Sequence, residues 1–239
     1  MKTFWKALAV IVLAHLSPVA LAADAAELDV QAGEMERLSE IDSTEAELAV
    51  AERFVTLAGS AENAERLVFA LRNGYETTLA GRDGDDQSAT RIYPVTGHLG
   101  LGNVFVSLAL AQEALHQAGI DQASPAEIDA ALNGGEVFVD GEAVRLRGVL
   151  AQRVDGVGWG RIAKSMGVRL GPVVASIRSA NDGLQRGHLQ VARSEAGSER
   201  SPARVEKADR PERPARPDRP DRPDRPDRPD RPDRPGKAK

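Results

Sequence analysis

The chain has 239 residues and a formal net charge of −5, with 31 Lys and Arg against 36 Asp and Glu. It contains no cysteine, which excludes disulfide bonds, thiolate zinc sites, a cysteine nucleophile and a lipid-modified cysteine anchor. Aromatic residues make up only 4% of the chain, so we expect a core built from Ala, Leu and Val in one domain or two small ones.

The first 22 residues have the three parts of a secretory signal peptide. Two lysines precede an apolar stretch over residues 7–16, and the small residues Ala20 and Ala22 stand just before the expected cleavage site. The stretch is about half as long as the ~20 residues that a bilayer crossing needs, and an uncleaved membrane anchor is the alternative. The sequence therefore predicts export to the periplasm or the exterior, a mature N-terminus near Ala23, and no transmembrane segment after removal of the signal.

Residues 23–53 are acidic and rich in alanine. Met35, Leu38 and Ile41 have helical spacing, but the apolar residues that follow lose the pattern. We therefore expect a weakly ordered, poorly anchored N-terminal segment here, followed by a folded domain over residues 54–180.

The folded domain is predicted to be mainly α with two short β-hairpins, which is an α+β class. Helices are expected over 61–73, 104–118 and 125–132, and hairpins should pair 75–79 with 90–95 and 136–139 with 142–146. Ser60 is the expected N-cap of the first helix, and Ser124 with Glu127 has the pattern of a capping box. Asp140-Gly141 is a two-residue hairpin turn.

An acidic turn in the first hairpin resembles a fragment of a calcium site. Asp83, Asp85 and Asp86 have part of the spacing of an EF-hand loop, but the further acidic residues and the glycine of that loop are missing. An ordinary solvated turn is therefore the favoured interpretation, and the sequence predicts no metal site.

A glycine-rich loop precedes the second expected helix. Backbone amides at a helix N-terminus can hold an anion, which makes Gly100, Gly102 and Asn103 candidate anion-binding residues. The glycine order is G-x-x-G-x-G rather than the dinucleotide fingerprint, so a tight turn that docks the helix is the other interpretation.

Residues 148–179 are predicted to form three short helices joined by turns, over 149–154, 159–166 and 172–179. Trp159 should be a core anchor of this unit. The spacing of Ala163 and Gly167 with the apolar residues that follow resembles the trihelical helix-turn-helix of sigma-factor region four and of resolvase-type domains.

That resemblance implies contacts with nucleic acid or with another polyanion. Residues 144–197 hold nine basic and three acidic side chains, and the candidate contacts are Arg161, Lys164, Arg169 and Arg178. The positions that would face bases are Arg169, Leu170, Gly171, Ala175 and Ser176, and among them only Arg169 could make a bidentate base contact. Since the signal peptide also argues against chromosomal DNA, we favour a structural packing unit over a reader of nucleic acid.

Four short motifs are distributed along the folded domain, at 59–64 (GSAENA), 71–74 (LRNG), 100–103 (GLGN) and 158–163 (GWGRIA). With these motifs and its basic, proline-rich tail, the chain resembles a group of exported bacterial proteins of unknown function. The resemblance implies export and a shared fold, and it implies no chemistry.

From Asp209 to Pro235 the chain consists of nine triplets that end in Arg-Pro. Proline at every third position fixes φ and removes amide donors, so we expect a disordered, polyproline II tail after a polar linker, over residues 181–239. This tail could be a spacer, could adhere through its arginines to an anionic polymer of the cell envelope, or could be a ligand for a partner domain.

No motif of a metalloprotease or a serine hydrolase is present, and the sequence predicts no catalytic residue and no cofactor. A hydrolase that uses paired carboxylates stays open, because the chain has many acidic residues of which two could meet. We therefore expect an exported, envelope-associated binding or structural protein, with nucleic-acid binding by residues 148–179 as the alternative function.

Overall fold

The computed structural model describes residues 18–81 and 88–199. Most of the predicted signal peptide, the acidic turn with Asp83, Asp85 and Asp86, and the Arg-Pro repeat lie outside the described residues. The chain divides into a body, Met1–Ser198, and a C-terminal unit, Glu199–Lys239, and only the body is described below. None of its described helices is long and apolar enough to span a bilayer.

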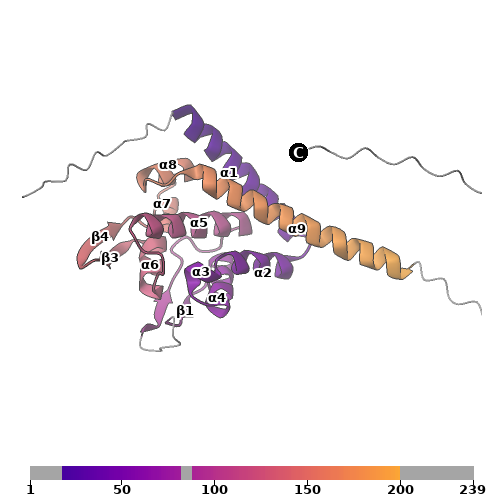
Figure 1. The fold of residues 1–239 in the computed structure, drawn as a ribbon, viewed down its shortest axis with the longest axis horizontal. Helices are drawn as coiled ribbons and strands as arrows, with labels where there is room; N and C mark the ends of the chain where they lie inside the picture. The colour runs from indigo at the N-terminus through magenta and orange to yellow at the C-terminus, as the bar shows by residue number, and fades with distance from the viewer. Residues whose placement is uncertain (1–17, 82–87, 200–239) are drawn as a thin grey trace, which may run out of the picture. The chain divides into compact units, whose positions relative to one another are not determined.

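The described residues are mainly α-helical with two short antiparallel hairpins, as predicted (Figure 1). The helices are α1 (Pro18–Ser39), α2 (Ser43–Arg53), α3 (Val55–Ala58), α4 (Ala61–Asn73), α5 (Leu101–Gln117), α6 (Pro125–Asn133), α7 (Val149–Val154), α8 (Trp159–Ser165) and α9 (Leu170–Glu199). The strands are β1 (Thr77–Leu79), β2 (Thr90–Ile92), β3 (Gly135–Val139) and β4 (Glu142–Leu146). β1 pairs with β2 and β3 pairs with β4.

Helix α5 is the centre of the body. Leu101, Phe105 and Leu108 are fully buried, and so are residues on its other sides, such as Val106 and Leu110. The first three turns of α5 are thus buried on almost every side, and such a segment must be surrounded by other elements. Accordingly α5 lies between α1 and α6, and it contacts both of them (Figure 1).

The expectation that residues 23–53 are weakly ordered is wrong. They form α1 and α2, and Leu28, Met35 and Val50 are completely buried in the same core as α5. Leu28 and Met35 are two turns apart, so they lie on one face of α1, and that face covers α5. The surface that anchors α1 is supplied by a helix more than sixty residues later, which the local pattern does not reveal.

The predicted helix caps and the predicted hairpin turn, which depend on residues close together in the sequence, are confirmed. The Ser60 hydroxyl accepts a hydrogen bond from the Asn63 N–H at 3.1 Å, and the capping box of Ser124 and Glu127 is complete. Asp140 and Gly141 both have positive φ, 51° and 84°, as a type I′ hairpin turn requires.

The C-terminal boundary of the folded domain was predicted too early. Helix α9 does not stop at residue 179 and runs for 30 residues to Glu199. Leu184 is buried, and the buried Asn181 amide donates to the backbone carbonyl and to the side-chain oxygen of Gln31, both at 3.0 Å. The segment predicted as a polar linker therefore begins as a helix that packs beside α1 (Figure 1).

The first two helices of the three-helix unit form where they were predicted, as α7 over Val149–Val154 and α8 over Trp159–Ser165, whereas the third is the much longer α9. Trp159 is 4% exposed, which confirms its expected place in the core. Leu170, one of the positions expected to face bases, is instead buried at the start of α9.

Candidate polyanion interface

The glycine-rich loop lies at the N-terminus of α5, as predicted, but the helix begins three residues earlier than expected. Gly100 is its N-cap residue, and Gly102 and Asn103 belong to its first turn. Free N–H groups of a first helical turn attract negative charge.

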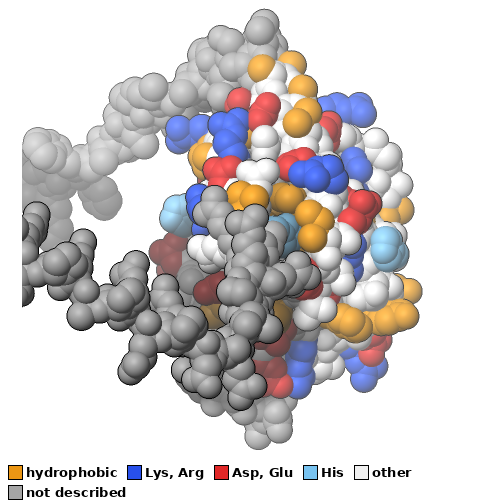
Figure 2. All heavy atoms as spheres, turned by 90° about the vertical axis from the view of Figure 1, so that its right-hand side faces the viewer, with side chains coloured by type: hydrophobic (Ala, Val, Ile, Leu, Met, Phe, Trp, Pro, Cys, Tyr) orange, Lys and Arg blue, Asp and Glu red, His pale blue; other side chains and the backbone are white. Residues whose placement is uncertain are grey.

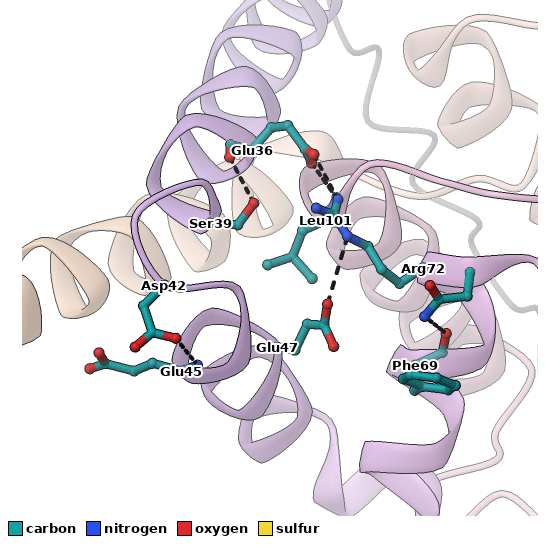
Figure 3. A network of polar contacts seen from close by, with 9 residues as sticks. Glu36, Ser39, Asp42, Glu45, Glu47, Phe69, Arg72 and Leu101 are labelled. Carbon is teal, nitrogen blue, oxygen red and sulfur yellow. Dashed lines mark hydrogen bonds and ion pairs between the residues drawn. The ribbon is translucent and has the colours of Figure 1, made fainter.

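The negative charge at this helix N-terminus belongs to the chain itself. Glu36 of α1 accepts a hydrogen bond from the Leu101 N–H, and Arg72 of α4 donates to both of its carboxylate oxygens at 2.7 and 2.8 Å (Figure 3). Glu47 of α2 lies 3.8 Å from the Arg72 Nε. This network joins four helices, because α1, α2, α4 and α5 each contribute one of its members.

Gly102 has a steric role. A Cβ atom at this position would lie 2.0 Å from the backbone oxygen of Ala32, so only glycine lets α1 approach α5 this closely. At Gly100 an added Cβ would lie 2.8 Å from the Glu36 carboxylate. The predicted anion site of Gly100, Gly102 and Asn103 is therefore a packing contact filled by Glu36, and the docking-turn interpretation replaces the ligand site.

Of the four predicted polyanion contacts, three lie on the surface of one segment. Arg161 and Lys164 are one turn apart on α8, and Arg169 lies in the turn that leads to α9; all three are exposed. Among the described residues none of the three has an ion-pair partner. We call Arg161, Lys164 and Arg169 the basic surface.

Arg178 does not belong to the basic surface. It donates a hydrogen bond to Glu27 of α1 at 2.7 Å, and this contact fastens α9 to α1. The Arg178 guanidinium, helped by the Gln31 amide, holds the pKa of Glu27 below its usual value. Arg178 is therefore already paired within the chain, and its contact with a polyanion stays a prediction.

The inner face of α8 holds the basic surface in place. Ile162 and Ala163 are fully buried, and the Arg153 guanidinium stacks over the ring of Trp159 at 4.2 Å from its centroid. The Ser165 hydroxyl donates to the Gln152 side chain at 2.6 Å and so links α8 to α7. Because these contacts fix the helix, its cations face solvent.

Sequence reasoning missed two further cations. Arg145 and Arg147 line a pocket of about 590 Å³ that lies between the α6–β3 junction and the segment that joins β4 to α7. They are two residues apart on an extended segment, and residues with that spacing project to the same side. This spacing is the signal that could have identified them.

Opposite charges are mixed on other parts of the surface. Figure 2 shows the end of the body where α2 and α9 lie, and acidic and basic side chains alternate there. Within residues 18–81 and 88–199, no group of three or more His, Asp and Glu side chains is arranged to hold a metal ion.

Comparison of the chain with protein-family models, with curated proteins and with solved structures found no match.

Proposed function

We propose that this protein is exported and acts in the cell envelope as a non-enzymatic binding protein, and that its basic surface contacts an anionic polymer. The observation that carries this proposal is the separation of charge along the chain. Residues 23–143 hold 23 acidic and six basic side chains, whereas residues 144–197 hold three acidic and nine basic ones. A local cationic region on an otherwise acidic protein directs an anionic partner to one place.

The position of the core supports export with removal of the first 22 residues. The first residue of the core cluster is Leu28, so cleavage before Ala23 leaves every residue of that cluster in the mature chain. Of α1, only residues 18–22 would be lost, which is about a turn and a half. The resemblance that the four sequence motifs carry would also imply export.

The Arg-Pro repeat would add to this attachment. Its arginines recur at every third position from Arg210 to Arg234, a spacing that suits repeated contacts with a regular polyanion. The same repeat would also serve as a spacer that lets the body reach an immobile polymer.

Binding of nucleic acid is the alternative function. Two of the side chains that would have to contact bases are engaged elsewhere in the fold. Leu170 is buried, and Ser176 accepts hydrogen bonds from Arg53 through both its carbonyl and its hydroxyl, at 3.3 Å each. Arg169 remains as the one side chain suited to a base edge, so phosphate contacts would dominate such a complex.

The test is co-sedimentation of the purified chain with protein-free envelope fragments at about 50, 150 and 500 mM NaCl, because salt screens contacts between exposed charges. We expect binding that falls as the salt rises. The variant that removes the basic surface carries Arg161→Gln, Lys164→Gln and Arg169→Gln, and it should sediment far less at the lowest salt.

The matched control removes three other exposed arginines, each of which already pairs with an acid: Arg37→Gln, Arg66→Gln and Arg91→Gln. This control should bind like the unmodified chain. Equal losses in the two triple variants would contradict the basic surface as the contact. Stronger binding to duplex DNA than to envelope fragments would favour the alternative function.

A further inference from the structure

The pocket beside β4 is built around exposed backbone. Gly134 and Gly148 have positive φ, 93° and 71°, and a Cβ on Gly148 would lie 2.3 Å from the Gly134 nitrogen. The α6–β3 and β4–α7 junctions therefore touch through two glycines, and Gly134 and Gly135 present main chain without side chains to the pocket. A volume of about 590 Å³ falls in the range of small-molecule sites.

Two polar side chains in the wall of the pocket are hydrogen-bonded within the protein. The Gln152 amide donates to the Gly148 carbonyl at 3.1 Å, and its oxygen accepts from Ser165 at 2.6 Å. The Asn133 amide donates to Asp129 at 2.7 Å. A ligand would therefore enter a pocket whose polar walls keep their shape, which lowers the entropic cost of binding.

The charged groups that line the pocket are not engaged with the described protein. In the part of the chain that the structure describes, the side chains of Arg145, Arg147 and Asp155 have no hydrogen-bond or ion-pair partner. Glu136, which faces Arg145 across the hairpin register, is not within ion-pair distance of it. Two guanidinium groups and one carboxylate give the pocket a formal charge of +1.

We propose that this pocket binds a small monocarboxylate that also carries an N–H or O–H donor. A guanidinium matches a carboxylate with two parallel hydrogen bonds, and Asp155 can accept from the donor group of the same ligand. A single negative charge neutralises the pocket, whereas a phosphate dianion would leave an excess charge beside Asp155. This small-ligand site is separate from the basic surface and does not depend on polymer binding.

The experiment is calorimetric titration of the full chain with two pairs of probes, each an acid with its neutral counterpart. N-acetyl-alanyl-alanine is compared with its C-terminal amide, and glucuronate is compared with glucose, so the two arms separate a peptide source of the carboxylate from a sugar source. We expect saturable binding of at least one acid and about tenfold weaker binding of its neutral counterpart, as the loss of a charge-assisted hydrogen bond implies. Inorganic phosphate is the fifth probe and should bind more weakly than the acid.

Two variants and one control locate the site. The double variant Arg145→Gln with Arg147→Gln should lose about tenfold in affinity for the acid, and Asp155→Asn should lose a smaller factor. The matched control, Arg91→Gln with Arg186→Gln, removes two arginines outside the pocket and should bind normally. Circular dichroism of each variant checks that the helical fold is intact.

Equal binding of acid and neutral probe, tighter binding of phosphate, or no binding up to about 10 mM would overturn the proposal. Unchanged affinity in the Arg145 and Arg147 variant would overturn it as well. The triple variant of the basic surface should keep full affinity for the acid. A failure of polymer binding and a failure of this pocket are therefore separate results.

Discussion

Glu36 and Arg72 form a two-pronged ion pair that closes the N-terminus of α5, with Arg72 Nη1 at 2.7 and 2.8 Å from the two carboxylate oxygens. The Arg72 side chain is 16% exposed and that of Glu36 is 37% exposed, so the pair is partly shielded from water. Because Glu36 also accepts the Leu101 N–H, one carboxylate satisfies both a cation and a free helix donor.

Replacing Glu36 tests how much its contacts with Arg72 and with the Leu101 N–H stabilise the fold. We expect Glu36→Gln to lower the free energy of unfolding by about 1–3 kcal/mol, because a charged acceptor is lost and Glu47, 3.8 Å away, is then the one carboxylate among the described residues that pairs with Arg72. Urea unfolding followed by circular dichroism measures the change. Glu34→Gln is the control, since Glu34 pairs with Arg37 on the outside of α1, and its midpoint should barely move. Equal losses of unfolding free energy in Glu36→Gln and Glu34→Gln would show that the contacts of Glu36 with Arg72 and Leu101 contribute no stability.

The contact between α1 and α5 depends on the absence of a side chain at Gly102. Gly102→Ala should destabilise the protein by about 3 kcal/mol, because the new methyl group would collide with backbone at Ala32 rather than with a movable side chain. Gly183→Ala in α9 is the matched control, since a Cβ there meets nothing within 4 Å, and it should be neutral or slightly stabilising. The midpoint of thermal unfolding is measured for both variants. A Gly102→Ala protein with an unchanged midpoint would contradict the close approach of α1 to α5 at Gly102.

Trp159 should carry much of the stability of the C-terminal helices. Trp159→Ala is expected to cost about 3–5 kcal/mol, because it leaves a cavity and removes the ring under Arg153. Phe138→Ala, at a side chain that is 68% exposed, should change the stability by less than about 0.5 kcal/mol. Denaturant unfolding measures both. A Trp159 variant with an unchanged midpoint would mean that the ring does not support α8.

The stabilisation that the ion pair between Glu27 of α1 and Arg178 of α9 provides should decrease at low pH. The hydrogen bond from Arg178 lowers the pKa of Glu27 in the folded protein. The ion pair between Glu27 and Arg178 therefore stabilises the fold fully above pH 4.5, the ordinary pKa of glutamate, and this stabilisation is lost as the pH falls through the lower pKa of the folded state. In Arg178→Gln the pKa of Glu27 should rise toward 4.5, as read from the side-chain carboxyl resonance in an NMR titration. Glu34, whose pKa is lowered by Arg37, serves as the internal reference and should not change.

Removal of residues 200–239 should leave the stability of the body unchanged. From Asp209 onward the tail contains no apolar residue larger than proline, so burial cannot compensate the ordering cost of about 1–2 kcal/mol per residue. Chains 1–239 and 1–199 should therefore unfold at the same urea concentration, and the shorter chain should bind envelope fragments less at low salt. A large loss of stability on truncation would indicate that the tail packs on the acidic part of the body.

Several features of the fold were predictable because they depend on residues close together in sequence. The caps at Ser60 and Ser124, the turn at Asp140-Gly141 and the bounds of α7 each rest on side chains within about four positions of one another. The cations Arg161, Lys164 and Arg169 were also found from sequence, since net charge over a segment needs no knowledge of the fold.

Tertiary structure alone decided how the ends of the domain are anchored and what the candidate sites contain. The partner of α1 is the surface of α5, the partner of Asn181 is Gln31, and the anion beside Gly100 is Glu36. Each of these contacts joins residues more than sixty positions apart, and local periodicity carries no information about such a partner. The pocket lined by Arg145 and Arg147 joins residues that are closer in sequence, but it too exists only because the chain folds back at two glycines and brings its walls together.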